Sequence, residues 1–124
     1  MAQMLVFVGA KTSELMRMLM EELDTRKQSE VVRRALLAHW KLKADFADRV
    51  PHVPDEDGPK NIQYHIRLPD RIHLLLLQER ADSYSRTIRL AIQRLAWCVQ
   101  IRKTTNMKQC RLEDEKWYAF LLTF

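Results

Sequence analysis

The chain has 124 residues, 47% of them hydrophobic and 30% charged, which is typical of a globular domain and not of a disordered segment. Its formal net charge is +5, and its two glycines, Gly9 and Gly58, lie too far apart for the glycine-rich phosphate loops of nucleotide-binding enzymes. No apolar run approaches the roughly 20 residues that span a bilayer. The run at residues 4–8 is too short for the core of a signal peptide and is followed by Gly-Ala-Lys, so we expect a cytoplasmic protein.

The first half of the chain predicts one strand followed by two helices. Residues 4–10 form a strand-like run that is apolar on both alternating faces, and residues 14–24 and the segment after residue 28 have helical periodicity. The apolar stripe of these two helices consists of Leu15, Leu19 and Leu23, then Val32, Ala35, Leu36 and Trp40.

The segment 50–59 separates this half from the next. It contains three prolines, a glycine and three acidic residues, a composition typical of an extended linker. We expect its carboxylates to be solvated.

The second half predicts the same order of elements. Residues 62–68 alternate apolar and polar side chains, which indicates a strand with one buried face. Pro69 ends this strand and Asp70 opens a helix over 70–82, while Ser83 is a suitable N-cap for the helix that follows. The apolar stripes are Ile72, Leu75 and Leu76 in the first helix and Ile88, Ala91, Ile92, Leu95 and Val99 in the second.

The two halves are related by an internal repeat. Residues 29–36 and 85–92 align at an offset of 56, with identical serine, arginine and alanine positions. A single strand has no partner, so we expect the two strands to pair as an antiparallel ribbon over a shared helical core. The predicted fold is therefore mainly α with one two-stranded ribbon, in a single pseudo-dimeric domain. Its parts are repeat one at about 4–44, a linker at about 45–60, repeat two at about 61–104 and a tail helix at about 111–124.

The sequence resembles the ribbon-helix-helix family of DNA-binding proteins, the MetJ/Arc/CopG group. The resemblance is carried by the alternating strand that ends in Arg67-Leu-Pro-Asp70, by the Ser83-Tyr-Ser85-Arg-Thr-Ile88 segment, and by Lys27-Gln-Ser29-Glu-Val-Val32 in the first copy. Most members are homodimers, whereas two copies in one chain are similar to the TraY-type relaxosome accessory proteins and the VirC-type DNA-binding proteins of T-DNA transfer. The resemblance implies a monomeric pseudo-dimer.

The resemblance implies that the ribbon enters the major groove of double-stranded DNA. Gln63, His65 and Arg67 would contact bases, with Lys11 as the cationic candidate near the end of the first strand. In that strand, either Leu5 and Phe7 touch thymine methyls or the strand is purely structural. Phosphate contacts are expected from Lys27, Ser29, Ser83, Ser85 and Arg86, at the starts of the second helices.

The implied function is sequence-specific DNA binding accessory to conjugative or T-DNA processing, with a relaxase and a ParA-like ATPase as further partners. Residues 61–111 hold ten basic and three acidic residues, which favours a polyanionic partner. Two alternatives stay open: a transcriptional repressor or antitoxin of the same fold, and a protein-interaction adaptor whose basic surface binds an acidic protein.

No residue pattern indicates catalysis, a metal site or a cofactor. Cys98 and Cys110 are too few for a disulfide framework, and the histidines lack ligand spacing. We therefore expect a binding protein and not an enzyme. The aromatic tail, residues 112–124, either folds back on the core or serves as a docking segment for another protein.

Overall fold

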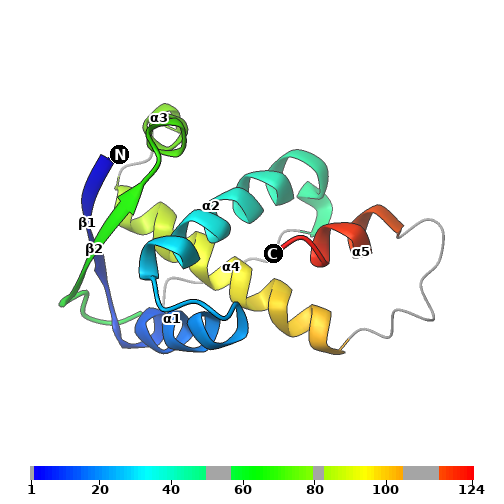
Figure 1. Ribbon diagram of the computed structural model, residues 1–124, viewed down its shortest axis with the longest axis horizontal. Helices are drawn as coiled ribbons and strands as arrows, with labels where there is room; N and C mark the ends of the chain where they lie inside the picture. The colour runs from blue at the N-terminus through cyan, green and yellow to red at the C-terminus, as the bar shows by residue number, and fades with distance from the viewer. Residues whose placement is uncertain (1, 50–56, 80–82, 105–114) are drawn as a thin grey trace.

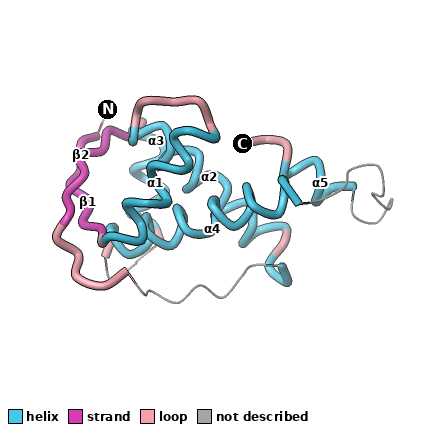
Figure 2. Tube along the Cα trace, turned by 90° about the horizontal axis from the view of Figure 1, so that it is seen from below, coloured by secondary structure: helices cyan, strands magenta, loops and turns pink. Residues whose placement is uncertain are grey.

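The computed structural model describes residues 2–49, 57–79, 83–104 and 115–124, which are mostly helical with one two-stranded antiparallel sheet. The elements follow in the order β1 (Ala2–Val8), α1 (Ala10–Glu22), α2 (Gln28–Asp45), a 3-10 turn (Ala47–Arg49), β2 (Ile62–Leu68), α3 (Asp70–Gln78), α4 (Tyr84–Thr104) and α5 (Glu115–Leu121). The ribbon lies at one end of the molecule and α5 lies towards the other (Figures 1 and 2).

The two strands pair over their full length. The register places Ala2 opposite Leu68 and Val8 opposite Ile62, with Leu5 opposite His65 at the centre. The strand predicted at 62–68 is confirmed. The first strand begins and ends two residues earlier than predicted, since Gly9 and Ala10 turn the chain into α1.

The inner face of the ribbon covers the helical core. Val6, Val8, Tyr64, Ile66 and Leu68 are buried on that face. They pack against buried apolar side chains of α1, α2, α3 and α4, among them Leu19, Leu36, Leu76, Ile88, Ile92 and Leu95. Most of the predicted stripe positions are thus core positions, because the helical period brings them to one face.

One stripe position was wrong. Leu75 is 40% exposed, and its neighbours on α3, Leu74 and Leu77, are exposed as well. The helix α3 has only nine residues, and Ile72 and Leu76, one turn apart, make its buried contact with the core.

The end of the linker is part of the core boundary, so the expectation of solvated carboxylates is wrong for Asp57, while Asp55 and Glu56 lie outside the described residues. Asp57 is buried, and its carboxylate accepts hydrogen bonds from Gly9 N (2.6 Å), Thr12 N (2.8 Å) and Thr12 Oγ1 (2.8 Å). Its backbone passes so close to Gly9 that a Cβ there would lie 2.0 Å from the Asp57 carbonyl oxygen. Gly9 is therefore needed for close approach, and Asp57 occupies the free amides at the start of α1.

The tail folds back on the ends of α2 and α4 (Figure 1). Trp117, Phe120 and Leu121 of α5 are buried, and Phe46 meets the Trp117 ring at 5.1 Å and the Phe120 ring at 5.3 Å. The helix covers 115–121 of the predicted 111–124, and residues 111–114 lie outside the described part of the chain.

Candidate nucleic-acid interface

The outer face of the ribbon carries a row of exposed side chains. Because successive side chains of a strand point to opposite sides, the odd-numbered positions of both strands face away from the helices. The exposed positions are Gln3, Leu5 and Phe7 on β1 and Gln63, His65 and Arg67 on β2. The exposure predicted for Gln63, His65 and Arg67 is confirmed.

The register pairs these side chains across the two strands. Gln3 lies opposite Arg67, Leu5 opposite His65 and Phe7 opposite Gln63. With its carboxamide oxygen turned towards the guanidinium, Gln3 accepts hydrogen bonds from Nε and Nη2 of Arg67 at 3.1 Å each. This contact holds the long arginine side chain over the ribbon.

Gln3 was missed by the sequence reading because the strand was expected to begin at residue 4. The alternation of the strand could have identified Gln3, because it continues the odd-numbered series of outward-facing positions that includes Leu5 and Phe7. Leu5 and Phe7 are 41% and 37% exposed, so this strand has an outer face of its own and is not buried on both sides.

Each edge of the ribbon is bonded to the start of a helix from the other half of the chain. The Oγ of Ser29, in the first turn of α2, accepts a hydrogen bond from Arg67 N at 2.9 Å. The Oγ of Ser85, in the first turn of α4, accepts one from Phe7 N at 3.0 Å. These serines satisfy amides that a two-stranded ribbon would leave unpaired at its edges, and they place the two helix N-termini beside the outer face.

The side chains predicted to contact phosphate lie around these two helix starts. Lys27 is the N-cap of α2 and is exposed, and Arg86 is exposed in the first turn of α4. Ser83 accepts a hydrogen bond from Arg86 N at 3.5 Å, which is the N-cap role predicted for it. Ser85 is largely buried beneath the edge of β1, and Ser29 is partly exposed.

Lys11 is not on the ribbon. It is an exposed residue in the first turn of α1, because β1 ends at Val8 and the helix has begun by Ala10. The structure therefore brings Gln63, His65 and Arg67 together on one face and leaves Lys11 beyond its edge.

The starts of α2 and α4 differ in charge. Glu30 follows Ser29 in α2, whereas Arg86 follows Ser85 at the equivalent position of α4. The Glu30 carboxylate accepts a hydrogen bond from the guanidinium of Arg33 and another from Arg34 Nε at 3.0 Å. The hydrogen bond from Arg33 outweighs the effect of burial and, with Arg34, lowers the pKa of Glu30 to about 2. The carboxylate thus stays ionised, and its charge is compensated within the same helix.

Metal ligation, membrane insertion and thiol reactivity depend on other features of the described part of the chain. No group of three or more histidine, cysteine or acidic side chains converges in the described ranges, and none of the helices found there has the length and hydrophobicity to cross a membrane. Burial raises the pKa of the Cys98 thiol to about 12, so it stays protonated. Cys110 lies outside the described residues.

Comparisons of the chain with known protein families, with characterised proteins and with solved structures find no match.

Proposed function

We propose that this protein is a tandem ribbon-helix-helix protein whose ribbon reads bases in the major groove of double-stranded DNA. The register supports this reading. A two-fold axis through the Leu5–His65 pair relates Gln3 to Gln63 and Phe7 to Arg67, and it relates the Ser29–Arg67 hydrogen bond to the Ser85–Phe7 hydrogen bond. Two fused repeats of one ancestral unit account for this symmetry.

The single observation that carries the proposal is the outer face of the ribbon. A two-stranded ribbon has the width of the major groove, and no helix in the described structure covers its six outward side chains. Three of those side chains, Gln3, Gln63 and Arg67, have the donor and acceptor groups that bind adenine and guanine edges in a bidentate manner.

The two halves of this face would read different bases. Arg67 suits guanine O6 and N7, Gln63 suits adenine N6 and N7, and His65 donates or accepts near the axis. Leu5 and Phe7 offer only apolar surface, which suits thymine methyl groups. We therefore expect an asymmetric DNA site, with guanine recognition confined to one side.

Phosphate contacts on either side of the groove would fix the position of the ribbon. The free amides at the starts of α2 and α4, together with Lys27 and Arg86, supply positive potential at both edges. Ser29 and Ser83 lie at the same two helix starts, where their hydroxyl hydrogens are donors for a phosphate oxygen. Ser85 is largely buried, so its main role would be to support the edge of β1.

The biological role we propose is accessory to the processing of transferable DNA, alongside a relaxase and a ParA-like ATPase. It rests on the resemblance of the two-copy arrangement to relaxosome and T-DNA transfer proteins. The same interface would serve a repressor or an antitoxin equally well, and the DNA sequence that it selects separates these roles.

The test is fluorescence anisotropy with a pool of labelled duplexes at about 50 and 200 mM salt, since phosphate contacts make the affinity steeply salt-dependent. The wild type is compared with Arg67→Ala and with a control variant, Arg17→Ala. Arg17 is an exposed arginine on α1, so the control removes the same charge at a site away from the ribbon. We expect Arg67→Ala to lose about tenfold or more in affinity for preferred duplexes and to keep the weak background binding. Arg17→Ala should retain the preference.

Equal losses in the two variants would mean that Arg67 contributes only charge. Absence of duplex binding by the wild type at moderate salt would reject the proposed function and leave the adaptor alternative.

A further inference from the structure

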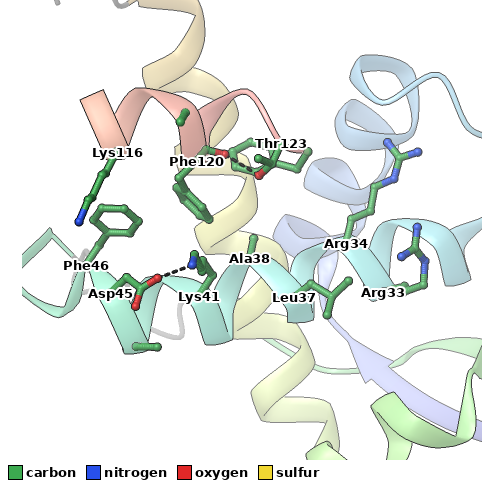
Figure 3. Close-up of a pocket in the computed structure, with 13 residues that line it drawn as sticks. Arg33, Arg34, Leu37, Ala38, Lys41, Asp45, Phe46, Lys116, Phe120 and Thr123 are labelled. Carbon is green, nitrogen blue, oxygen red and sulfur yellow. Dashed lines mark hydrogen bonds and ion pairs between the residues drawn. The ribbon is translucent and has the colours of Figure 1, made fainter. Parts of the chain in front are cut away.

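A groove runs along α2, from Arg33 to the end of the helix at Asp45, with α5 on its other side (Figure 3). Its volume is about 1180 Å³. Its floor is apolar: Ala38 and Phe120 are buried there, and Phe46 and Phe124 are partly buried at its side. Leu37 lines the same groove and is 43% exposed.

The groove is held open by a well-packed wall. Trp117 lies 5.6 Å from the Phe120 ring and 6.1 Å from the Trp97 ring, which fixes α5 against α4. Arg102 of α4 donates to the carbonyl oxygens of Leu121 and Phe124, and its guanidinium lies over the Phe124 ring, 5.3 Å from the centroid. The last turn of α5 and the residues after it are therefore anchored and do not fill the groove.

The rim of the groove is basic. Of the described residues that line it, Arg33, Arg34, Lys41 and Lys116 are basic and Asp45 is acidic. Figure 3 places Lys116 at one end, near Phe46, and the two arginines at the other. Glu30 pairs with both arginines and Asp45 with Lys41, so the four positive charges face two negative ones and the rim keeps a positive excess.

We propose that this groove binds an acidic amphipathic helix of a partner protein. Apolar side chains at helical spacing would lie along Leu37, Phe46 and Phe120, and flanking carboxylates would meet Lys116 at one end and the arginines at the other. The charge excess selects an acidic segment over a basic or neutral one. The inference does not rest on DNA binding, because none of the residues that line the groove belongs to the strands of the ribbon.

The test uses the full chain and a fluorescein-labelled, helix-forming peptide of about four turns, with leucine and phenylalanine on one face and glutamate elsewhere. Two further peptides act as controls: one of the same composition whose apolar residues do not share a face, and one with lysine in place of every glutamate. Binding is measured by anisotropy, and circular dichroism melting verifies that each variant is folded.

Two pairs of variants locate the site. Leu37→Asp introduces a charge into the groove, and Leu74→Asp makes the same change at an exposed leucine of α3. Lys116→Glu reverses a rim charge, and Arg17→Glu reverses an exposed charge on α1. We expect the groove variants to weaken binding of the acidic peptide about tenfold and the control variants to change it less than about twofold.

Equal binding of the lysine peptide or the scrambled peptide would overturn the proposal, as would equal effects of the groove and control variants. Should Leu37→Asp fail to fold, the Lys116→Glu and Arg17→Glu pair decides by itself. If the acidic peptide does not bind but the wild type self-associates in light scattering and Lys116→Glu abolishes this, the groove joins copies of this chain instead. Arg67→Ala should leave peptide binding unchanged, so that failure of the DNA proposal does not decide this one.

Discussion

Asp57 links the end of the linker to the first helix through three hydrogen bonds, from Gly9 N, Thr12 N and Thr12 Oγ1. Burial by itself would raise the pKa of this carboxyl. The hydrogen bonds from Thr12 and Gly9, with the positive charge of Arg89, outweigh burial and bring the pKa below its usual value. The ionised carboxylate is therefore the form that the fold stabilises.

We predict that Asp57→Asn lowers the free energy of unfolding by about 1–3 kcal/mol at neutral pH, since buried amides lose a charged acceptor. The contribution of Asp57 is fully present above the unfolded-state pKa of about 3.9 and is lost as the pH falls towards the lower folded-state pKa. Urea denaturation at pH 7 and pH 3 should thus show a smaller gap between wild type and variant in acid. Asp45→Asn, which removes a surface ion pair with Lys41, is the control, and an equal loss there would contradict the assignment.

His39 is buried between α2 and α4, with its Nδ1 2.9 Å from Arg94 Nη1. A guanidinium only donates, so Nδ1 accepts and the proton of the neutral ring is on Nε2, which lies 3.9 Å from Glu79 Oε1. Burial, followed by the charges of Arg94 and Lys43, lowers the pKa of His39 to about 4. The neutral ring is part of the fold.

We predict that His39 makes the fold progressively less stable as the pH falls from about 6.5 to about 4, because the unfolded chain binds the proton more tightly over this range. The full effect is up to about 3 kcal/mol. His39→Gln keeps an acceptor for Arg94 and should flatten this part of the stability curve, measured by urea denaturation at several pH values. A curve that is the same in wild type and His39→Gln would reject the prediction.

At the scale of elements, α5 is a short helix that depends on tertiary contacts. Seven residues are too few for a stable isolated helix, so the aromatic cluster of Phe46, Trp97, Trp117 and Phe120 keeps it folded. Arg49 adds a cation–π contact at 5.1 Å from the Trp117 centroid. The tail is therefore a structural part of the domain, and it forms one wall of the groove.

We predict that Trp117→Ala lowers the free energy of unfolding by about 3 kcal/mol, the usual cost of removing a large buried aromatic side chain. Leu122, which is 61% exposed, provides the control, and Leu122→Ala should cost little. Thermal melts followed by circular dichroism measure both. A Trp117→Ala melt that coincides with that of the wild type would show that α5 packs only weakly on the core.

At the scale of the whole molecule, the two halves of the chain complete each other. The α2 helix of the first half contacts β2 of the second, and α4 of the second contacts β1 of the first. The serine hydrogen bonds across both ribbon edges follow the same crossing pattern. Neither half has its strand pairing or its edge contacts without the other, so we expect the two halves to unfold together.

The asymmetry of the ribbon leads to a prediction that rests on the proposed function. Phe7 is the position that the two-fold axis relates to Arg67. Phe7→Arg should therefore add guanine recognition on the second side and raise affinity for an inverted-repeat site about tenfold or more, the value of one bidentate contact. Anisotropy with matched symmetric and asymmetric duplexes measures the change, and Phe7→Ala controls for loss of the ring. An equal gain on all duplexes would mean that the new arginine acts only on phosphates.

Three features can be predicted from the order of residues alone: the alternation of residues 62–68, the helical stripes, and the repeat at residues 29–36 and 85–92. From these follow a mainly helical fold with one ribbon and the exposure of Gln63, His65 and Arg67. These features depend on residues that are close in the chain, whose spacing is set by the periods of strands and helices.

The contacts between residues that are distant in the chain could be found only in the folded structure. The pairing of Gln3 with Arg67 required the strand register, and the burial of Asp57 required the position of Gly9. The groove between α2 and α5 required the packing of Trp117 on the far side of the core. Such contacts are fixed by backbone geometry and by competition among many apolar side chains for one core, and no local pattern of residues encodes that competition.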